Sequence, residues 1–416
     1  MSRTRLIVIG LVLVLIAAVG AGFAYYVTGR KSADPAPPRT HVPRRAAVSS
    51  TIAAPPPTTT TAKPRKPAYG PDWPTYGRTL NRTRDASEMT SIHPPYRIAW
   101  QRRGGGLLEY PPTYSHGVLY EAADSGWVTA RSVFSGRMYW AHKLETVLAS
   151  PTIGKRFLYL PSYDGRLYAL SRKTGRVAWS AYMGGEIEGS PALWHGRVYE
   201  GTLSGSMRAF NASNGHRLWS LSVSGAVKHG PAIAGGRLYF GDYGGSMWCV
   251  GALSGHVVWR SSLGGEFYST PAVAKGRVYV GNNDGSVYSL GASSGRVIWS
   301  TGLGGWAYGS PAVSHGRVFA TAYNGMVAAI DARTGSVLWR HQLPYGTLAS
   351  PAVIGRSVYV ADRGPSAGSK GQLFAYNPGN GKRVWSFSDG KFSSVIAAAN
   401  RLIVAGFFEL YALKPR

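Results

Sequence analysis

Short apolar or alternating runs of residues fill the chain after residue 95 and predict β-strands. Between Ser269 and Ser300, four such runs are separated by turn signals. The clearest of these signals is Asp284-Gly285, a pair that accepts the positive φ angles of a tight hairpin turn. No helical period competes in this part of the chain. Four short antiparallel strands within about 40 residues are typical of one propeller blade.

The same unit recurs along the chain, and tryptophans mark its last strand. They are Trp100, Trp140, Trp179, Trp219, Trp259, Trp299, Trp339 and Trp385. Seven of the copies also begin their inner strand at a proline, a position where no ladder hydrogen bond is lost. A fixed period of this size indicates one supersecondary unit copied many times. The sequence therefore predicts an all-β propeller of four-stranded blades over residues 71–416.

The number of blades depends on the two ends of the repeat region. Seven units are complete, while the last stretch, 394–413, has only three predicted strands. An unpartnered strand, 96–100, precedes the first unit and has the sequence of an outer strand. If that strand completes the last unit, the ring closes without exposed edges and has eight blades. Seven blades with a separate hairpin are the alternative.

Two sequence features carry a resemblance to a known superfamily. The unit ending Ala329–Trp339 and the segment Asp72–Thr83 resemble the tryptophan-docking repeat and the lead-in of quinoprotein (pyrroloquinoline-quinone-repeat) propellers. That superfamily contains quinone-dependent dehydrogenases and non-enzymatic proteins such as the BamB assembly lipoproteins. The resemblance implies that the eight repeat tryptophans are structural and pack between blades. Fold alone does not choose between the two branches.

The first 70 residues predict a membrane anchor and a linker. A basic tail, residues 1–5, precedes 22 uncharged residues, 6–27, which are long enough to span a bilayer as a transmembrane helix. Residues 28–70 form a basic Pro/Thr-rich linker that is expected to be disordered. We interpret 6–27 as an uncleaved signal anchor, with a cleaved signal peptide as the alternative. The propeller is then expected on the extracytoplasmic side of the cell membrane.

Charge and chemistry narrow the classes of function. The net charge of +27 favours contact with anionic polymers or lipids, although a compositional bias towards arginine is the alternative explanation. The lone Cys249 permits no intramolecular disulfide, and no metal-ligand spacing or nucleic-acid motif is present. The dehydrogenase branch implies calcium, an aspartate base and usually paired cysteines. We therefore expect a monomeric protein that is not an enzyme and has no catalytic residues, metal or cofactor.

Departures from the repeat point to one end of the propeller. Loops before the inner strands and hairpins between the second and third strands open on the same end, called the funnel face here. The candidate binding residues on it are Tyr163, Glu188, Lys228, His229, Tyr243, Tyr268, Trp306, Tyr308 and Tyr323. Aromatic and charged side chains of this kind are typical of interaction surfaces. An enlarged loop, 363–371, is expected on this face, either as a contact element or as a tolerated insertion.

These features lead to one functional hypothesis and two alternatives. We expect a membrane-anchored propeller that binds an envelope protein as a scaffold, similar to the BamB branch. The BamB branch is attached to lipid through a cysteine, but this sequence has no cysteine near residue 27. In this respect the sequence departs from that branch. The first alternative is a sensor or binding module for an anionic envelope polymer or a small ligand. A quinone-dependent dehydrogenase is the less favoured alternative.

Overall fold

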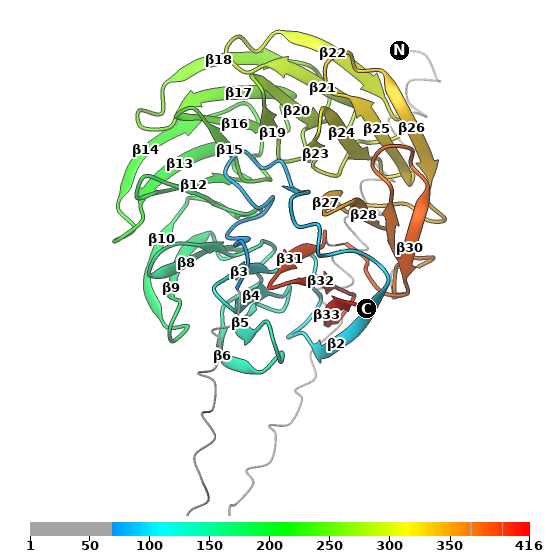
Figure 1. Ribbon diagram of the computed structural model, residues 1–416. Coiled ribbons are helices and arrows are strands. Elements are labelled where there is room, and N and C mark those ends of the chain that lie inside the picture. Colours follow the sequence, from blue (N-terminus) through cyan, green and yellow to red (C-terminus); the bar gives the residue numbers. More distant parts are fainter. Residues whose placement is uncertain (1–68, 367, 393) are drawn as a thin grey trace, which may run out of the picture. The chain divides into compact units, whose positions relative to one another are not determined.

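The computed structural model describes residues 69–366, 368–392 and 394–416, and these form eight β-sheets arranged as a ring of blades (Figure 1). The predicted all-β, eight-bladed propeller is confirmed. The predicted transmembrane segment 6–27 and almost all of the linker lie outside the described residues. Within the described part of the chain, no helix is long and apolar enough to cross a membrane.

Six blades follow one pattern, with four consecutive strands from the axis outward. The first three blades comprise β3 (Thr113–Ser115), β4 (Val118–Ala122), β5 (Trp127–Ser132) and β6 (Met138–Lys143); β7 (Thr152–Ile153), β8 (Phe157–Ser162), β9 (Arg166–Ser171) and β10 (Val177–Tyr182); and β11 (Ala192–Trp194), β12 (Arg197–Thr202), β13 (Ser206–Asn211) and β14 (Arg217–Ser222). The next three comprise β15 (Ala232–Ala234), β16 (Arg237–Gly241), β17 (Ser246–Gly251) and β18 (Val257–Ser262); β19 (Ala272–Ala274), β20 (Arg277–Gly281), β21 (Ser286–Gly291) and β22 (Val297–Gly302); and β23 (Ala312–Ser314), β24 (Arg317–Thr321), β25 (Met326–Asp331) and β26 (Val337–Gln342).

The last two blades depart from this pattern. The seventh comprises β27 (Ala352–Ile354), β28 (Ser357–Ala361), β29 (Leu373–Tyr376) and β30 (Arg383–Phe387), with β1 (Asp85–Ala86) added in parallel beside β27. The eighth comprises β31 (Ile396–Ala398), β32 (Arg401–Ala405), β33 (Glu409–Pro415) and, as its outer strand, β2 (Tyr96–Arg103). Antiparallel pairing of β2 with β33 joins the beginning and the end of the ring.

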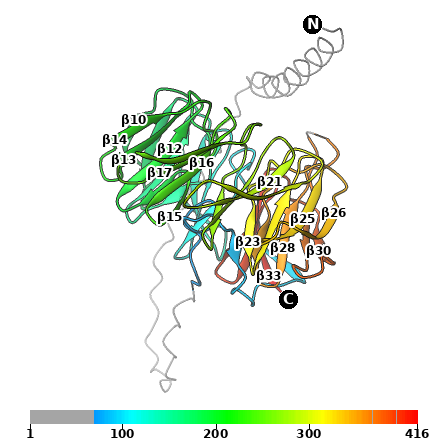
Figure 2. The ribbon, with the colours of Figure 1, turned by 90° about the horizontal axis from the view of Figure 1, so that it is seen from above.

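The core lies between neighbouring blades rather than inside any one blade. The second and third strands are buried on both faces, so their apolar side chains meet those of the next blade. Tyr199 and Met207 of the third blade, for example, belong to the same buried cluster as Phe240 and Trp248 of the fourth. In Figure 2 the strands β12–β17 lie on one side of the ring and β21–β28 on the other. Each blade is thus stabilised mainly by its two neighbours.

The repeat tryptophans connect successive blades by hydrogen bonds. Trp219 donates its indole N–H to the Ala252 carbonyl of the following blade at 3.0 Å, and Trp259 donates to Ala292 in the same way at 3.0 Å. The ring also lies against the turn glycine of that blade, where a Cβ on Gly255 would be 2.8 Å from the Trp219 ring. Trp385 packs edge-on against Tyr96, with 5.0 Å between the ring centroids.

A lead-in segment, residues 69–95, lies inside the ring and passes along the inner strands of successive blades (Figure 1). Trp73 forms a β-bridge with Tyr114 of the first blade. Further round, backbone carbonyls of the lead-in accept hydrogen bonds from the inner strands, with donor–acceptor distances of 2.7 to 3.0 Å. The donors are Ile153, Ile233, Val273, Val313 and Val353. The lead-in therefore ties most of the blades together around the axis.

Candidate functional site

Seven of the nine candidate residues form one group near the axis, called the funnel cluster. The loops before β11, β15, β19 and β23 carry Glu188, Lys228 with His229, Tyr268 and Tyr308, and the hairpins β8–β9 and β16–β17 add Tyr163 and Tyr243. Because each loop follows an outer strand and each hairpin joins two buried strands, the repeat delivers these side chains to one end of the ring. The other two candidates, Trp306 and Tyr323, lie apart from this group.

Glu188 is the centre of the polar contacts in the funnel cluster. Its carboxylate accepts hydrogen bonds from the Tyr163 hydroxyl at 3.0 Å and from the Tyr110 hydroxyl at 3.4 Å. Lys228 Nζ lies 3.2 Å from Glu188 Oε1, and only 9% of the Glu188 side chain is exposed. The acid is thus neutralised and hydrogen-bonded within the protein, as buried charges usually are.

Lys228 is held as a cation by its surroundings. Burial alone would lower its pKa, but Tyr308 and Glu188 outweigh burial and raise the pKa well above its usual range. Its ammonium also lies 5.6 Å from the centroid of the Tyr268 ring, a cation–π arrangement. The funnel cluster therefore contains an ion pair, Glu188 and Lys228, that is surrounded by tyrosine side chains.

Three tyrosines form a continuous aromatic surface beside this ion pair. The Tyr243 and Tyr268 centroids are 4.6 Å apart, and Tyr268 stacks on Tyr308 at 5.1 Å. The Tyr268 hydroxyl donates to Glu266 at 2.6 Å, which fixes the direction of the ring. Such an arrangement buries apolar ring faces while satisfying the hydroxyl groups.

His229 within the funnel cluster is neutral near pH 7, and Glu109 next to the cluster is partly neutral. Burial, reinforced by Lys228 and Arg84, lowers the pKa of His229 to about 3. Burial and repulsion from Glu188 raise the pKa of Glu109 to about 7. His229 also packs edge-on against Tyr308, with centroids 6.4 Å apart. Burial near the axis thus favours the uncharged forms of His229 and Glu109.

The lead-in supplies a layer of buried side chains next to the funnel cluster. The Arg82 guanidinium is almost wholly buried and donates to the Ser190 carbonyl at 3.1 Å and to the Pro231 carbonyl at 3.2 Å. The Arg84 guanidinium lies 4.1 Å from the centroid of the Tyr76 ring. Tyr76 in turn contacts Tyr110 at 6.0 Å between ring centroids. These contacts link the lead-in to the side chains that surround Glu188.

Trp306 and Tyr323 belong to a second group on the funnel face, the rim patch, together with Tyr345 and Arg363. The Trp306 and Tyr323 rings are 5.8 Å apart, and Arg363 donates to the Tyr323 hydroxyl at 2.6 Å. Trp306 is 46% exposed and Tyr345 is 40% exposed. Arg363 belongs to the enlarged loop of the seventh blade, and its backbone N–H donates to Gly346 O at 2.8 Å. The structure thus places one end of that loop in the patch.

Sequence reasoning missed five of the residues that shape these sites: Tyr76, Arg84, Tyr110, Tyr345 and Arg363. Arg363 was noted only as part of an insertion. Tyr76 and Arg84 lie outside the repeats, so no periodic signal marked them. Tyr110 lies in the loop before β3, and no residue in that loop was among the candidate binding residues. Within the described residues, no three His, Cys, Asp or Glu side chains lie close enough together to bind a metal ion.

Comparison with known families finds one matching family model, described as "Outer membrane protein assembly factor BamB". It matches residues 85–226, 203–300 and 249–402, which together cover most of the propeller. Among curated proteins, the dehydrogenase subunit of a quinone alcohol dehydrogenase from Gluconobacter oxydans is 27% identical over 149 residues. That match covers 31% of this chain and 19% of the relative, so the chain spans about a fifth of that protein.

Solved structures show the same fold at low sequence identity. The BamB structure from Moraxella catarrhalis superposes with a TM-score of 0.68 at 18% identity, covering 77% of this chain and 98% of that chain. The quinohemoprotein alcohol dehydrogenase from Comamonas testosteroni has a TM-score of 0.70 at 14% identity, covering 83% of this chain and 81% of that chain. BamB and an alcohol dehydrogenase therefore share this architecture.

Proposed function

The chain belongs to the family described as outer membrane protein assembly factor BamB, and from this premise we propose that it is a protein-binding scaffold of the cell envelope. In this proposal the segment 6–27 anchors the chain in the cell membrane and the propeller is extracytoplasmic. The funnel face is the surface that receives the partner.

The observation that carries the proposal is the contrast between the funnel cluster and the rim patch. The charges of the cluster, Glu188 and Lys228, neutralise each other and are largely buried, so the cluster stabilises the funnel rather than attracting ions. The rim patch instead presents Trp306 and Tyr345 at 46% and 40% exposure beside an arginine. Trp, Tyr and Arg are the residues enriched at the energetic centres of protein interfaces.

Partner capture by variants of the full chain tests this proposal. We expect Trp306→Ala combined with Tyr345→Ala to weaken capture of a discrete envelope protein by at least about tenfold, since each large interface anchor contributes on the order of 1–2 kcal/mol. Leu253→Ala is the matched control, because Leu253 is 54% exposed but lies in a turn at the opposite end of its blade. Equal capture by both variants would remove the rim patch from the interface.

A quinone-dependent dehydrogenase is the second candidate, and the partial matches to alcohol dehydrogenases support it. The residues at the funnel do not fit the calcium and quinone that this candidate implies. Glu188 is already bound by Lys228 and Tyr163, and Glu109 has its pKa raised to about 7. Dye-linked oxidation of alcohols or sugars by the full chain, supplied with calcium and the quinone, would favour this candidate over the scaffold.

A further inference from the structure

A second surface feature lies at the opposite end of the blades, where the first and second blades meet. It is a groove of about 460 Å³ called the basic groove. Its lining consists of Tyr120, Lys155, Arg156, Phe157, Ser171, Arg172 and Lys173. Four of these seven residues are cations and none is an acid. Among the described residues, none of the four cations forms an ion pair.

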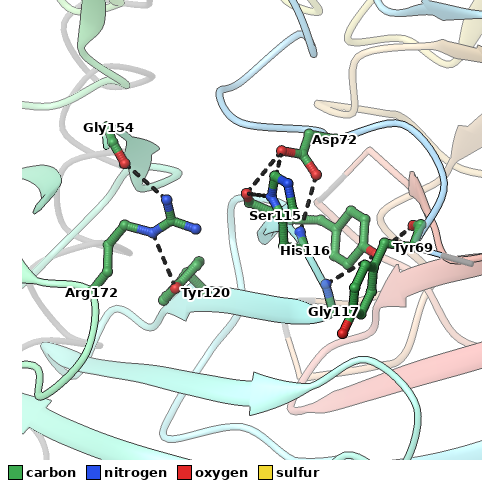
Figure 3. Close-up of polar contacts among 9 residues, drawn as sticks. Tyr69, Asp72, Ser115, His116, Gly117, Tyr120, Gly154 and Arg172 are labelled. Carbon is green, nitrogen blue, oxygen red and sulfur yellow. Dashed lines mark hydrogen bonds and ion pairs between the residues drawn. The ribbon is translucent and has the colours of Figure 1, made fainter. Parts of the chain in front are cut away.

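One cation of the basic groove is fixed in place by hydrogen bonds, as Figure 3 shows. Arg172 donates from Nη1 to the Gly154 carbonyl at 3.0 Å and from Nε to the Tyr120 hydroxyl at 3.3 Å. Its guanidinium is also 5.6 Å from the centroid of the Tyr120 ring. Lys155, Arg156 and Lys173 are exposed around it. The groove thus combines one oriented guanidinium with three cationic groups on long, flexible side chains. Such a set of cations is suited to binding a phosphate group.

An equivalent groove between the fourth and fifth blades shows that the set of four cations is not a general property of the repeat, because that groove has only two cations, Arg237 and Lys275. That groove has a similar volume, about 470 Å³, and includes Tyr239 at the position equivalent to Tyr120. At the positions of Arg156, Arg172 and Lys173, however, the fifth blade has uncharged residues: Gly276, Ala292 and Ser293. The repeat supplies the shape of the groove, and the second blade alone adds this set of cations to it.

The start of the described chain lies against the first blade, at the same end of the ring as the basic groove. The Tyr69 carbonyl accepts a hydrogen bond from the Tyr114 hydroxyl, and Figure 3 shows Tyr69 next to Gly117. The Tyr69 ring lies 6.2 Å from the ring of Phe134 in the first blade. Phe134 occupies the turn of the first blade that corresponds to the Arg172-Lys173 turn of the second. The predicted membrane segment ends 42 residues before Tyr69. The described part of the chain therefore begins at the end of the ring that carries the groove.

We propose that the basic groove binds the phosphate of an anionic phospholipid headgroup. Arg172 receives the phosphate in a fixed orientation, while Lys155, Arg156 and Lys173 surround the remaining oxygens. Cations near an anionic lipid surface each contribute about a factor of five in affinity. The site is separate from the funnel face, so it and the proposed scaffold function can be tested independently.

The test uses the full chain in a neutral detergent, titrated by calorimetry with short-chain phosphatidylglycerol, short-chain phosphatidylcholine and inorganic phosphate. We expect phosphatidylglycerol to bind and phosphatidylcholine not to bind. The variant R156G/K173S gives the second blade the residues of the fifth at two exposed positions, so the fold is retained. It should weaken phosphatidylglycerol binding by about 30-fold, since two cations are lost. R172A should reproduce the loss through the oriented guanidinium.

A matched control and three contrary outcomes make the test decisive. R237A/K275A removes two cations from the equivalent groove and should leave phosphatidylglycerol affinity unchanged. Equal weakening by this control would show that only the net charge acts, which overturns the site. Inorganic phosphate that binds as tightly as phosphatidylglycerol would overturn the lipid as the ligand. Unchanged lipid binding by R156G/K173S would overturn the proposal altogether.

Discussion

The ion pair between Glu188 and Lys228 gives the sharpest prediction about the funnel cluster. Its side chains are only 9% and 18% exposed, and the charged atoms are 3.2 Å apart. At an effective dielectric constant of about 20, two unit charges at this distance attract each other by about 5 kcal/mol, and desolvation opposes that gain. Removing one partner leaves the other charge buried without its counter-ion.

Three variants separate these effects. Lys228→Met and Glu188→Gln should each lower the free energy of unfolding by about 3 kcal/mol, as is usual when a buried pair is broken. The hydroxyl groups of Tyr163 and Tyr110 still donate to the remaining carboxylate in the first variant, which keeps the loss at the lower end. The double variant removes both charges and should lose no more than about 1–2 kcal/mol.

Equilibrium urea unfolding of the full chain in detergent, followed by circular dichroism, measures these differences. The coupling energy between the two sites should then be about 4 kcal/mol or more. Glu88→Gln is a control, since Glu88 forms an ion pair with Arg78 but is 55% exposed, and it should cost less than about 1 kcal/mol. Single-variant losses that add within about 0.5 kcal/mol would refute the view of Glu188 and Lys228 as a coupled pair.

Two further predictions concern stability elsewhere in the ring. Gly255 and Gly276 share a left-handed backbone, with φ of 75° and 73°, but only a Cβ on Gly255 would strike the Trp219 ring. In thermal unfolding, Gly276→Ala should lower the free energy of unfolding by about 1–2 kcal/mol, which is the cost of the left-handed conformation. Gly255→Ala should lower it clearly more, because its Cβ also meets the Trp219 ring. Equal losses would contradict the packing of the tryptophan against the glycine. Burial raises the pKa of Glu200 to about 8, so the unfolded chain loses this proton at lower pH than the folded chain, and stability should fall from about pH 4.5 to pH 8. Glu200→Gln should match the wild type near pH 4.5 and exceed it by a few kcal/mol at pH 8, and parallel pH profiles would refute this assignment.

The repeat made most of the architecture predictable from the sequence. Tryptophans and prolines at a period near 40 indicate the blades directly, because each copy must present the same surfaces to its neighbours. The last unit, 394–413, lacks a fourth strand, and the early strand 96–100 lacks a blade. Their pairing in the eighth blade could therefore be predicted. In the same way, the equivalent loop positions of the repeats predicted that the candidate residues lie together, and seven of the nine form the funnel cluster.

Contacts made by segments that occur only once could not be predicted in this way. The path of the lead-in depends on six inner strands that exist only after the ring has formed, so nothing local marks Arg82 or Arg84 as buried. Nor does the sequence separate the exposed Trp306 from the largely buried Glu188, since both occupy loops before an inner strand. The cations of the second blade were not predicted from the sequence, and only the structure shows that Arg156 and Arg172 line one groove.

Site-specific photo-crosslinking in cell envelopes tests the scaffold proposal most directly. A photoreactive phenylalanine analogue replaces Trp306 on the funnel face or Leu253 in a turn at the other end, in the full chain; both positions are about half exposed. The account predicts a discrete protein adduct from position 306 that persists at high salt, and none from position 253. Adducts from both positions alike, or from position 253 alone, would contradict it.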